Sequence, residues 1–273
     1  MKTTLKKIFL YVLLMLISVI TFTPLLWMIS ASVMPSGDAN TFPPKFFPST
    51  ITFEHYITLF TRLNIGRYVF NSFLVSLGVT ALSTIINSLA GYAFAKFRFR
   101  GRDKLFKFLI ASMIVPAQVT MLPLFLMLNK MGLVNTYWGI LVPGLASIFG
   151  IFLIRQYALS LPESLIEAAK IDGATEIEIY WRIILPLTKP ILVTLGLFTF
   201  MGTWNDFLWP LIIMTDDAMY TLPVAVGNLM GEHAPDTELM MAGSVLTVLP
   251  ILLVFLFVQK QYIKGIMAGS VKG

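Results

Sequence analysis

Six long stretches almost free of charge constrain this sequence of 273 residues more than any other feature. A helix needs about 20 consecutive apolar residues to cross a bilayer, so each stretch is long enough for one spanning helix. In the hydrocarbon core every backbone N–H and C=O must be paired within the protein, which restricts spanning segments to helices or closed barrels. The stretches are 8–37, 68–95, 108–129, 131–154, 239–259 and, interrupted only by Asp206, 190–215.

We therefore predict an all-α integral membrane protein with six transmembrane helices. Their cores are expected at 9–31, 69–94, 108–128, 137–155, 190–213 and 239–259. The composition agrees, because 57% of the residues are hydrophobic and only 12% are charged, far from the mix of a soluble domain. No soluble part is large enough to fold alone, so residues 1–273 are expected to form a single transmembrane domain.

The basic residues predict the orientation of the chain. If the N-terminus is cytoplasmic, all but four of the 20 basic residues lie on the cytoplasmic side, the exceptions being Lys45, Arg62, Arg67 and Lys130. This asymmetry is what the positive-inside rule describes, and six spans then place both termini in the cytoplasm. The first apolar run is too long for a signal-peptide core, so we interpret it as an uncleaved first helix.

The loops differ in composition. The outer segment 34–66 is rich in proline and aromatic residues, which predicts a packed cap with short helical pieces. A second outer segment, 216–238, is expected to carry a short apolar helix near 222–230. His55 and His233 both lie in these segments without a cluster of further ligands, so we expect surface residues and no metal site. The chain has no Cys, which excludes disulfides and thiolate sites.

The longest charged interruption runs from Glu163 to Lys189. Pro162 fits a first helical position, where its missing N–H has no cost, and Glu163 lies favourably near the positive helix end. Residues 163–172 are expected to form a short helix that Gly173 ends.

A second short helix follows, because Thr175 and Glu178 have the spacing of a capping box. Four apolar residues recur in it at helical spacing: Ile177, Tyr180, Trp181 and Ile184. Such spacing predicts a face that packs against something. The sequence therefore predicts an angled pair of short helices beneath the membrane.

Two interpretations of this helix pair compete. A hairpin that lies on lipid headgroups usually carries Lys or Arg on its polar face. Here acidic residues outnumber basic ones, with Glu163, Glu167, Asp172, Glu176 and Glu178 against Lys170 and Arg182. An anionic leaflet would repel that surface, so the charge pattern favours docking to a protein partner.

Several motifs resemble those of ATP-binding-cassette importer permeases. The string Glu167-Ala168-Ala169, then Gly173, then Ile184-Leu185-Pro186 is similar to the EAA signature of that family. The carbohydrate-importer branch, with subunits similar to the smaller membrane protein of the maltose transporter, matches more of the chain. The supporting pieces are Asn71-Ser72, Ala93-Phe94-Ala95, Phe99-Arg100-Gly101-Arg102, Pro116, Pro123, Trp204-Asn205-Asp206-Phe207 and the tail Ala268–Gly273.

The resemblance implies the type I importer permease fold and a sugar or oligosaccharide as substrate. It also implies a second homologous permease, two copies of a cytosolic ATPase and an extracytoplasmic solute-binding protein as partners. The loop at about 156–189 would insert into a cleft on the ATPase through Glu167, Ala168, Ala169, Asp172 and Gly173, with Leu165 and Ile171 packing beneath. The tail residues Gly269, Ser270, Val271, Lys272 and Gly273 would contact the ATPase dimer.

The chain itself has no Gly-Lys pair and therefore no phosphate-cradling loop. ATP and Mg²⁺ are thus expected on the ATPase partners, with no cofactor on this chain. It also lacks the common nucleophile and metalloprotease motifs, so we do not expect an enzyme. An ion-coupled transporter would need several buried acids, and an intramembrane enzyme would need clustered catalytic groups. Neither pattern is visible in the sequence.

Asp206 is the one carboxylate expected within a span. Such a residue either lines a transport path or links two helices, and both interpretations remain open. The candidate translocation path consists of Trp204, Asn205 and Asp206. In the maltose system, by resemblance, the sugar pocket belongs mainly to the other permease. The aromatic rings of Trp204, Phe207 and Trp209 could stack on sugar faces, but the concentration of Trp at membrane interfaces favours an interfacial position.

Overall fold

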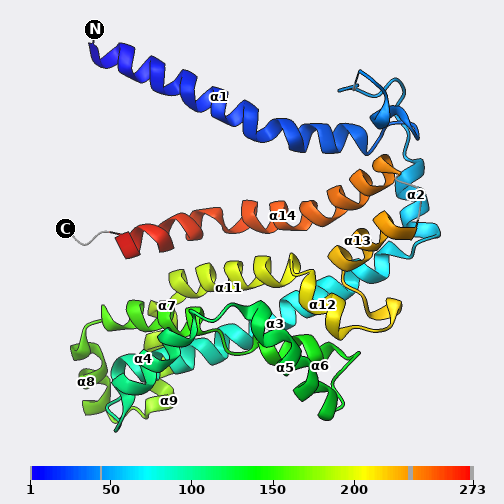
Figure 1. Ribbon diagram of the computed structural model, residues 1–273. Coiled ribbons are helices and arrows are strands. Elements are labelled where there is room, and N and C mark those ends of the chain that lie inside the picture. The colour runs from blue at the N-terminus through cyan, green and yellow to red at the C-terminus, as the bar shows by residue number, and fades with distance from the viewer. Residues whose placement is uncertain (1, 44, 233–235, 271–273) are drawn as a thin grey trace. The chain divides into compact units, whose positions relative to one another are not determined.

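The structure, a computed structural model, describes residues 2–43, 45–232 and 236–270, and these form helices and connecting loops without a strand (Figure 1). Contacts divide the chain into two compact units, which are described separately. Unit 1 contains Met1–Arg67 and Ala225–Pro250, and unit 2 contains Tyr68–Val224 and Ile251–Gly273. The longer helices are α1 (Lys2–Ala31), α2 (Glu54–Thr61), α3 (Ile65–Lys96), α4 (Arg102–Ser112), α5 (Ala117–Lys130), α6 (Tyr137–Gly144), α7 (Ile148–Leu159), α8 (Glu163–Ile171), α11 (Lys189–Trp204), α13 (Leu222–Glu232) and α14 (Thr237–Ser270). Shorter elements are η1 (Asp38–Asn40), α9 (Glu176–Ile179), the π-helical η2 (Tyr180–Ile184), α10 (Leu185–Leu187), α12 (Leu208–Ile213) and η3 (Asp217–Met219).

The prediction of an all-helical membrane protein is confirmed. Four segments in the described chain are long and apolar enough to span a membrane: Leu5–Ala31, Ile65–Lys96, Tyr137–Leu159 and Thr237–Gln259. Two bent helix pairs meet the same criteria together, Arg102–Ser112 with Ala117–Lys130 and Glu176–Leu187 with Lys189–Trp204. Counting each bent pair as one span gives the six spans expected from the sequence.

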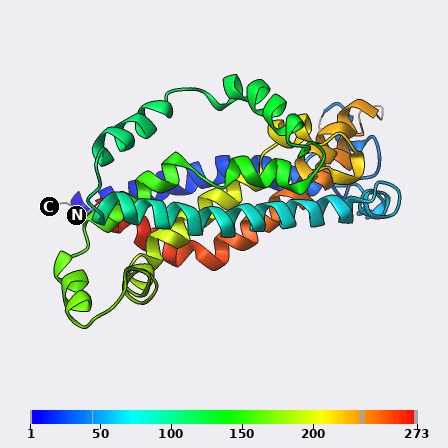
Figure 2. The ribbon, with the colours of Figure 1, turned by 90° about the horizontal axis from the view of Figure 1, so that it is seen from below.

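The third and fifth spans are not the single helices predicted at 108–128 and 190–213. The two halves of the third span, α4 and α5, are bent by 104°, and Figure 2 shows them as an arch. Pro116 causes the break, because it lacks an N–H and disfavours helical geometry in the residue before it. In the fifth span, α11 ends at Trp204 and α12 begins only at Leu208.

In unit 1 the outer cap is tied to the start of α14. The predicted short helical pieces of segment 34–66 are present as η1 and α2. The Oε1 atom of Glu238, a fully buried residue, accepts a hydrogen bond from the Ala39 N–H at 2.7 Å. The hydroxyl of Thr237 donates to the side-chain oxygen of Asn40 at 2.9 Å. These bonds join two segments that are almost 200 residues apart in the sequence.

The prediction that His55 is a surface residue is wrong. His55 is only 3% exposed, and its Nε2 lies 2.8 Å from the carbonyl oxygen of Met34. It is therefore a structural residue of the cap, because its side chain pairs a backbone carbonyl between the end of α1 and η1. His233 lies outside the described residues. The short helix expected near 222–230 is confirmed as α13.

In unit 2 a line of buried polar residues on α3 organises the packing. The Asn71 amide donates to the carbonyl oxygens of Ala218 and Tyr220 at 3.0 and 2.9 Å, and accepts from the Tyr137 hydroxyl at 2.8 Å. Near the other end of α3, the Asn87 oxygen accepts from the Ser147 N–H at 3.0 Å. Polar side chains of this kind commonly hold membrane helices together. Both ends of unit 2 are thereby fixed to α3.

Candidate functional sites

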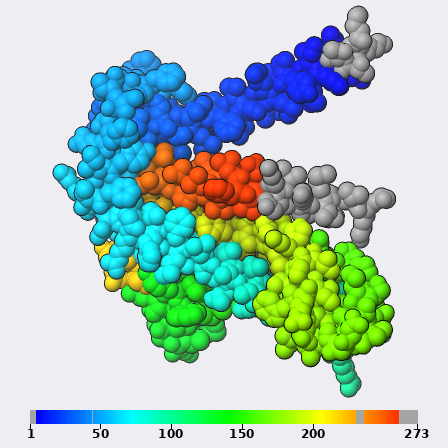
Figure 3. Space-filling view, turned by 180° about the vertical axis from the view of Figure 1, so that it is seen from behind, coloured from blue at the N-terminus to red at the C-terminus, as the bar shows by residue number. Residues whose placement is uncertain are grey.

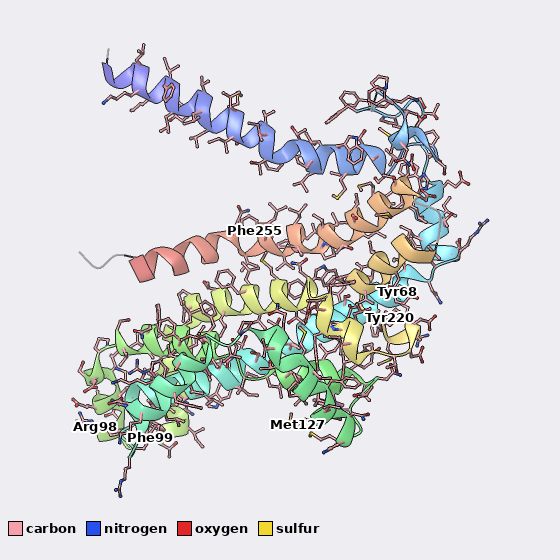
Figure 4. The ribbon with its side chains drawn as sticks, viewed as in Figure 1. Tyr68, Arg98, Phe99, Met127, Tyr220 and Phe255 are labelled. Carbon is pink, nitrogen blue, oxygen red and sulfur yellow. The ribbon has the colours of Figure 1, made fainter. Side chains whose placement is uncertain are left out.

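Residues 163–187, here called the α8–α9 module, project at one end of unit 2. Figure 3 shows their surface at that end, and Figure 4 shows Arg98 and Phe99, from the segment after α3, beside them. Tyr68 and Tyr220 mark the opposite end of unit 2 (Figure 4). The Lys96 ammonium donates to the Leu161 carbonyl oxygen at 2.7 Å, which ties the entrance of the module to the end of α3.

Gly173 produces the turn between α8 and α9, as the sequence predicts. Its φ of 82° lies in the left-handed region, where a side chain is strained. A Cβ added there would meet nothing within 4 Å, so the backbone conformation alone explains the glycine. The Gly173 and Ala174 N–H groups donate to the carbonyl oxygens of Lys170 and Ala169, which closes the end of α8.

The predicted capping box at the start of α9 is present. The Glu178 carboxylate accepts from the Thr175 N–H at 3.0 Å, and the Thr175 hydroxyl oxygen accepts from the Glu178 N–H at 3.3 Å. Glu178 thereby pairs the Thr175 N–H at the start of α9. Across the turn, Lys170 Nζ lies 2.6 Å from Glu176 Oε1 and adds a link between α8 and α9. The turn is therefore built as a defined elbow.

The inner face of the module packs on α3. Ile166 and Ala169 of α8 are buried in a cluster with Tyr92, Ile179 and Tyr180. The Tyr180 hydroxyl also forms a hydrogen bond with the hydroxyl of Ser88, in the interior of α3. This contact anchors the module to a membrane-spanning helix, so a displacement of one would act on the other.

The residues of α8 that pack on α3 are Ile166 and Ala169, which occupy its inner face. The reason is helical spacing, since residues three apart share a face and Ile166 with Ala169 meets the α3 surface. Ala169 therefore packs within this chain. Leu165 and Ile171, expected to pack beneath the joint with the ATPase, are 43% and 86% exposed in this chain, so their role at that joint stays a prediction.

In the second helix, the predicted apolar face is divided. Tyr180 and Ile184 are buried, but Ile177 and Trp181 are 72% and 51% exposed. Residues 180–184 form a π-helical turn, which changes the angular spacing and directs Ile179 inward. Glu167, Ala168, Asp172 and Gly173 of the elbow are exposed as well. The outer surface of the module thus combines acidic groups with uncovered apolar side chains.

The predicted tail contact lies largely beyond the described chain. Gly269 and Ser270 are the last residues of α14, and Val271, Lys272 and Gly273 lie outside the described residues.

The second site is a cavity of about 350 Å³ in unit 2, here called the Asp206 cavity. Four segments contribute side chains to it: α3, α5, α6 and the α11–α12 junction. The lining residues are Val79, Ala117, Thr120, Met121, Leu124, Ile140, Pro143, Gly144, Thr203, Asp206 and Trp209. The carboxylate of Asp206 accepts from the Trp209 N–H at 3.3 Å at the start of α12, which fixes its position.

Of the three residues predicted for the translocation path, only Asp206 lines this cavity. Trp204 is 1% exposed, and its ring packs against Phe73 and Phe200 with centroids 4.7 and 5.7 Å away. It is therefore a core residue in this structure. The side chain of Asn205 is exposed and donates to the Met201 carbonyl oxygen at 3.0 Å.

Sequence reasoning missed the other polar groups of the cavity. Thr203 precedes Asp206 by three residues, so helical spacing could have indicated it. Thr120 carries no such signal, because it reaches the cavity only through the packing of α5. Trp209, expected at the membrane interface, is buried, and its Nε1 donates to the Gly139 carbonyl oxygen at 3.1 Å.

Comparison with known proteins gives a consistent result. The family described as "Binding-protein-dependent transport system inner membrane component" matches residues 86–267. The arabinooligosaccharides transport system permease protein AraQ of Halalkalibacterium halodurans is 38% identical over 260 residues, covering 94% of this chain and 93% of that protein. The lactose transport system permease protein LacG of Rhizobium radiobacter is 33% identical over the full length of both chains.

A solved structure has the same fold. It belongs to a bacterial ABC transporter involved in the import of the acidic polysaccharide alginate. One of its chains is 26% identical, with a TM-score of 0.82 over 94% of this chain and 96% of that one.

Proposed function

Because this chain belongs to the family of binding-protein-dependent transport system inner membrane components, we propose that it is the permease of an ATP-driven importer that moves a sugar or oligosaccharide into the cytoplasm. As a member of that family it is a multi-pass inner-membrane transport component and not an enzyme. The carbohydrate substrate is supported by relatives whose names refer to arabinooligosaccharides, lactose and galactooligosaccharides.

The partners follow from the same proposal. A second homologous permease completes the membrane part, and a solute-binding protein delivers the sugar from outside. Two copies of a cytosolic ATPase bind ATP and Mg²⁺, because this chain lacks the loop that would hold a nucleotide phosphate.

The observation that carries the coupling role is the exposed outer surface of the α8–α9 module. Ile171, Ile177 and Trp181 leave apolar area uncovered on an element that is otherwise acidic and well anchored. Uncovered apolar side chains within a polar rim mark protein interaction sites. A rigid elbow in a socket on the ATPase would transmit movement to α3 through the Tyr180–Ser88 contact.

The orientation belongs to this proposal as well. With both termini in the cytoplasm, the α8–α9 module and the basic segment 96–107 lie together on the cytoplasmic side. Their adjacency in Figure 4, where Arg98 and Phe99 flank the module, supports that arrangement. Residues 1–273 then act as one permease domain with its coupling loop at 156–189.

Capture of the cytosolic ATPase by the purified membrane complex tests the coupling role. The variants Ile171→Glu and Glu167→Lys should each lose most of the captured ATPase, and sugar uptake into vesicles should fall with it. Ile57→Glu is a matched control, because Ile57 is 61% exposed but lies on α2 in the outer cap. If ATPase capture and uptake survive both changes in the module, the docking role is wrong.

A further inference from the structure

We propose that the Asp206 cavity holds part of a neutral saccharide chain during its passage and selects against acidic sugars. The inference rests on the proposed function and specifies its substrate class. It also gives this subunit a share of substrate contact, where the family resemblance implies a pocket mainly in the other permease.

The size and wall of the cavity suit a small polar ligand. Its volume of about 350 Å³ falls within the range of ordinary small-molecule sites, about 300–1,000 Å³. The wall is largely apolar, and it includes the Trp209 ring, held by a hydrogen bond from its Nε1 to the Gly139 carbonyl oxygen. A fixed aromatic ring beside a few polar groups can pack against the C–H face of a sugar while its hydroxyls are paired.

The polar groups of the cavity offer acceptors to a ligand. The Thr120 hydroxyl donates to the Ala117 carbonyl oxygen at 2.8 Å, which leaves the Thr120 oxygen available as an acceptor. The Asp206 carboxylate accepts from the Trp209 N–H and can also accept from sugar hydroxyls. A hydrogen bond to an ionised group is stronger than one between neutral groups, so hydroxyl donors are favoured at this position.

The charge of the lining determines the substrate class. Among the described residues that line the cavity, Asp206 carries a charge and no Lys or Arg is present. An acidic sugar would bring a second carboxylate into a site without a cation to pair it, and an unpaired charge is costly to bury. The lining therefore accepts neutral sugars and repels uronates, although the fold is shared with a transporter for the acidic polysaccharide alginate.

The test uses the assembled importer in lipid vesicles, with ATP inside and labelled oligosaccharides outside. The probes are a neutral arabinooligosaccharide, a neutral galactooligosaccharide and an oligouronate from alginate of equal length. Binding of each probe to the importer is also measured without the solute-binding protein, so that the selectivity of that protein does not affect the measured affinities. Wild type should bind and import a neutral probe and exclude the oligouronate.

The variant Asp206→Asn keeps the shape of the side chain and removes its charge. It should weaken binding of the neutral probe about tenfold, the difference between a charge-assisted and a neutral hydrogen bond, and admit the oligouronate. Asp217→Asn is the matched control, since Asp217 is an exposed aspartate in η3 and does not line the cavity. It should leave both affinities unchanged.

The outcomes separate the two proposals. The substrate-class inference is overturned, while ATP-driven import stands, if wild type binds the oligouronate with the same affinity as the neutral probes. The same holds if Asp206→Asn has the same affinities for the probes as Asp217→Asn. If no saccharide is imported in an ATP-dependent way by the complete assembly, the proposed function itself is wrong.

Discussion

The close contact between Gly144 and Val79 allows the packing around the Asp206 cavity to be tested by a double-mutant cycle. Gly144 is the last residue of α6, and a Cβ added there would lie 2.8 Å from Cγ1 and 3.4 Å from Cγ2 of Val79 on α3. Val79 is only 3% exposed, and its Cγ atoms already occupy the space beside Gly144. The substitution Gly144→Ala therefore forces a methyl group into a filled contact between two helices.

The expected size of the effect follows from two opposing contributions. Overpacking of a filled core costs about 1–3 kcal/mol. Replacing glycine by alanine in a helix contributes about 0.5–1 kcal/mol of stability in the other direction. We expect Gly144→Ala to lower the free energy of unfolding by about 1–2 kcal/mol.

Removing the opposing methyl groups should reverse part of this loss. In Val79→Ala both Cγ atoms are absent, and the remaining Cβ of residue 79 lies 3.7 Å from the Cβ added at Gly144, an ordinary contact distance. The double variant Val79→Ala/Gly144→Ala should therefore be more stable than the sum of the single changes, by about 1–2 kcal/mol of coupling. Gly202→Ala is the control, because a Cβ at Gly202 on α11 would meet nothing within 4 Å.

The measurement is unfolding of the purified variants in one detergent, followed by tryptophan fluorescence and circular dichroism. Gly202→Ala should be at least as stable as wild type, and Gly144→Ala clearly less stable. The packing argument fails if Gly144→Ala matches Gly202→Ala, or if the losses of the two single variants simply add in the double variant.

Four further predictions concern other parts of the chain. Gly173→Val should reduce ATPase capture more than Gly173→Asn, because asparagine tolerates the left-handed backbone at φ 82°; equal capture would contradict this. Asn71→Leu should lower the unfolding free energy by about 1–3 kcal/mol by leaving buried groups unpaired, as measured by denaturation. Glu178→Ala should remove the carboxylate half of the capping box, and at constant pH the protection of the amides at the start of α9 against hydrogen exchange should fall; unchanged protection would contradict this. Removal of residues 268–273 should lower the transport rate of the reconstituted complex without preventing its assembly, and unaltered ATP turnover would count against the tail contact.

The spans and the elbow could be predicted from sequence because both depend on local patterns. Charge-free length identifies a membrane segment without knowledge of its neighbours. The Gly173 turn and the Thr175–Glu178 capping box are likewise set by residues within one or two turns. The confirmed features of the α8–α9 module are of this kind.

The features that sequence reasoning missed depend on contacts between distant segments. Apolar residues occur on both faces of α8, so the sequence alone could not distinguish Ile166, which packs on α3, from Ile171, which remains exposed. The burial of His55 requires the end of α1 to lie beside α2. The Asp206 cavity requires four segments to meet, and the spacing of residues within any one segment does not predict such an arrangement.

The bend between α4 and α5 restricts which parts of the chain can face lipid tails. The helices contain 11 and 14 residues, so each reaches only about 16–21 Å and neither alone crosses the hydrocarbon layer. Helix ends leave backbone carbonyl and N–H groups without intrahelical partners, and lipid tails cannot pair them. Non-helical backbone at membrane depth is tolerated only where protein covers it or where it lines a water-filled cavity. The joint between α4 and α5 therefore requires such a covering in the bilayer.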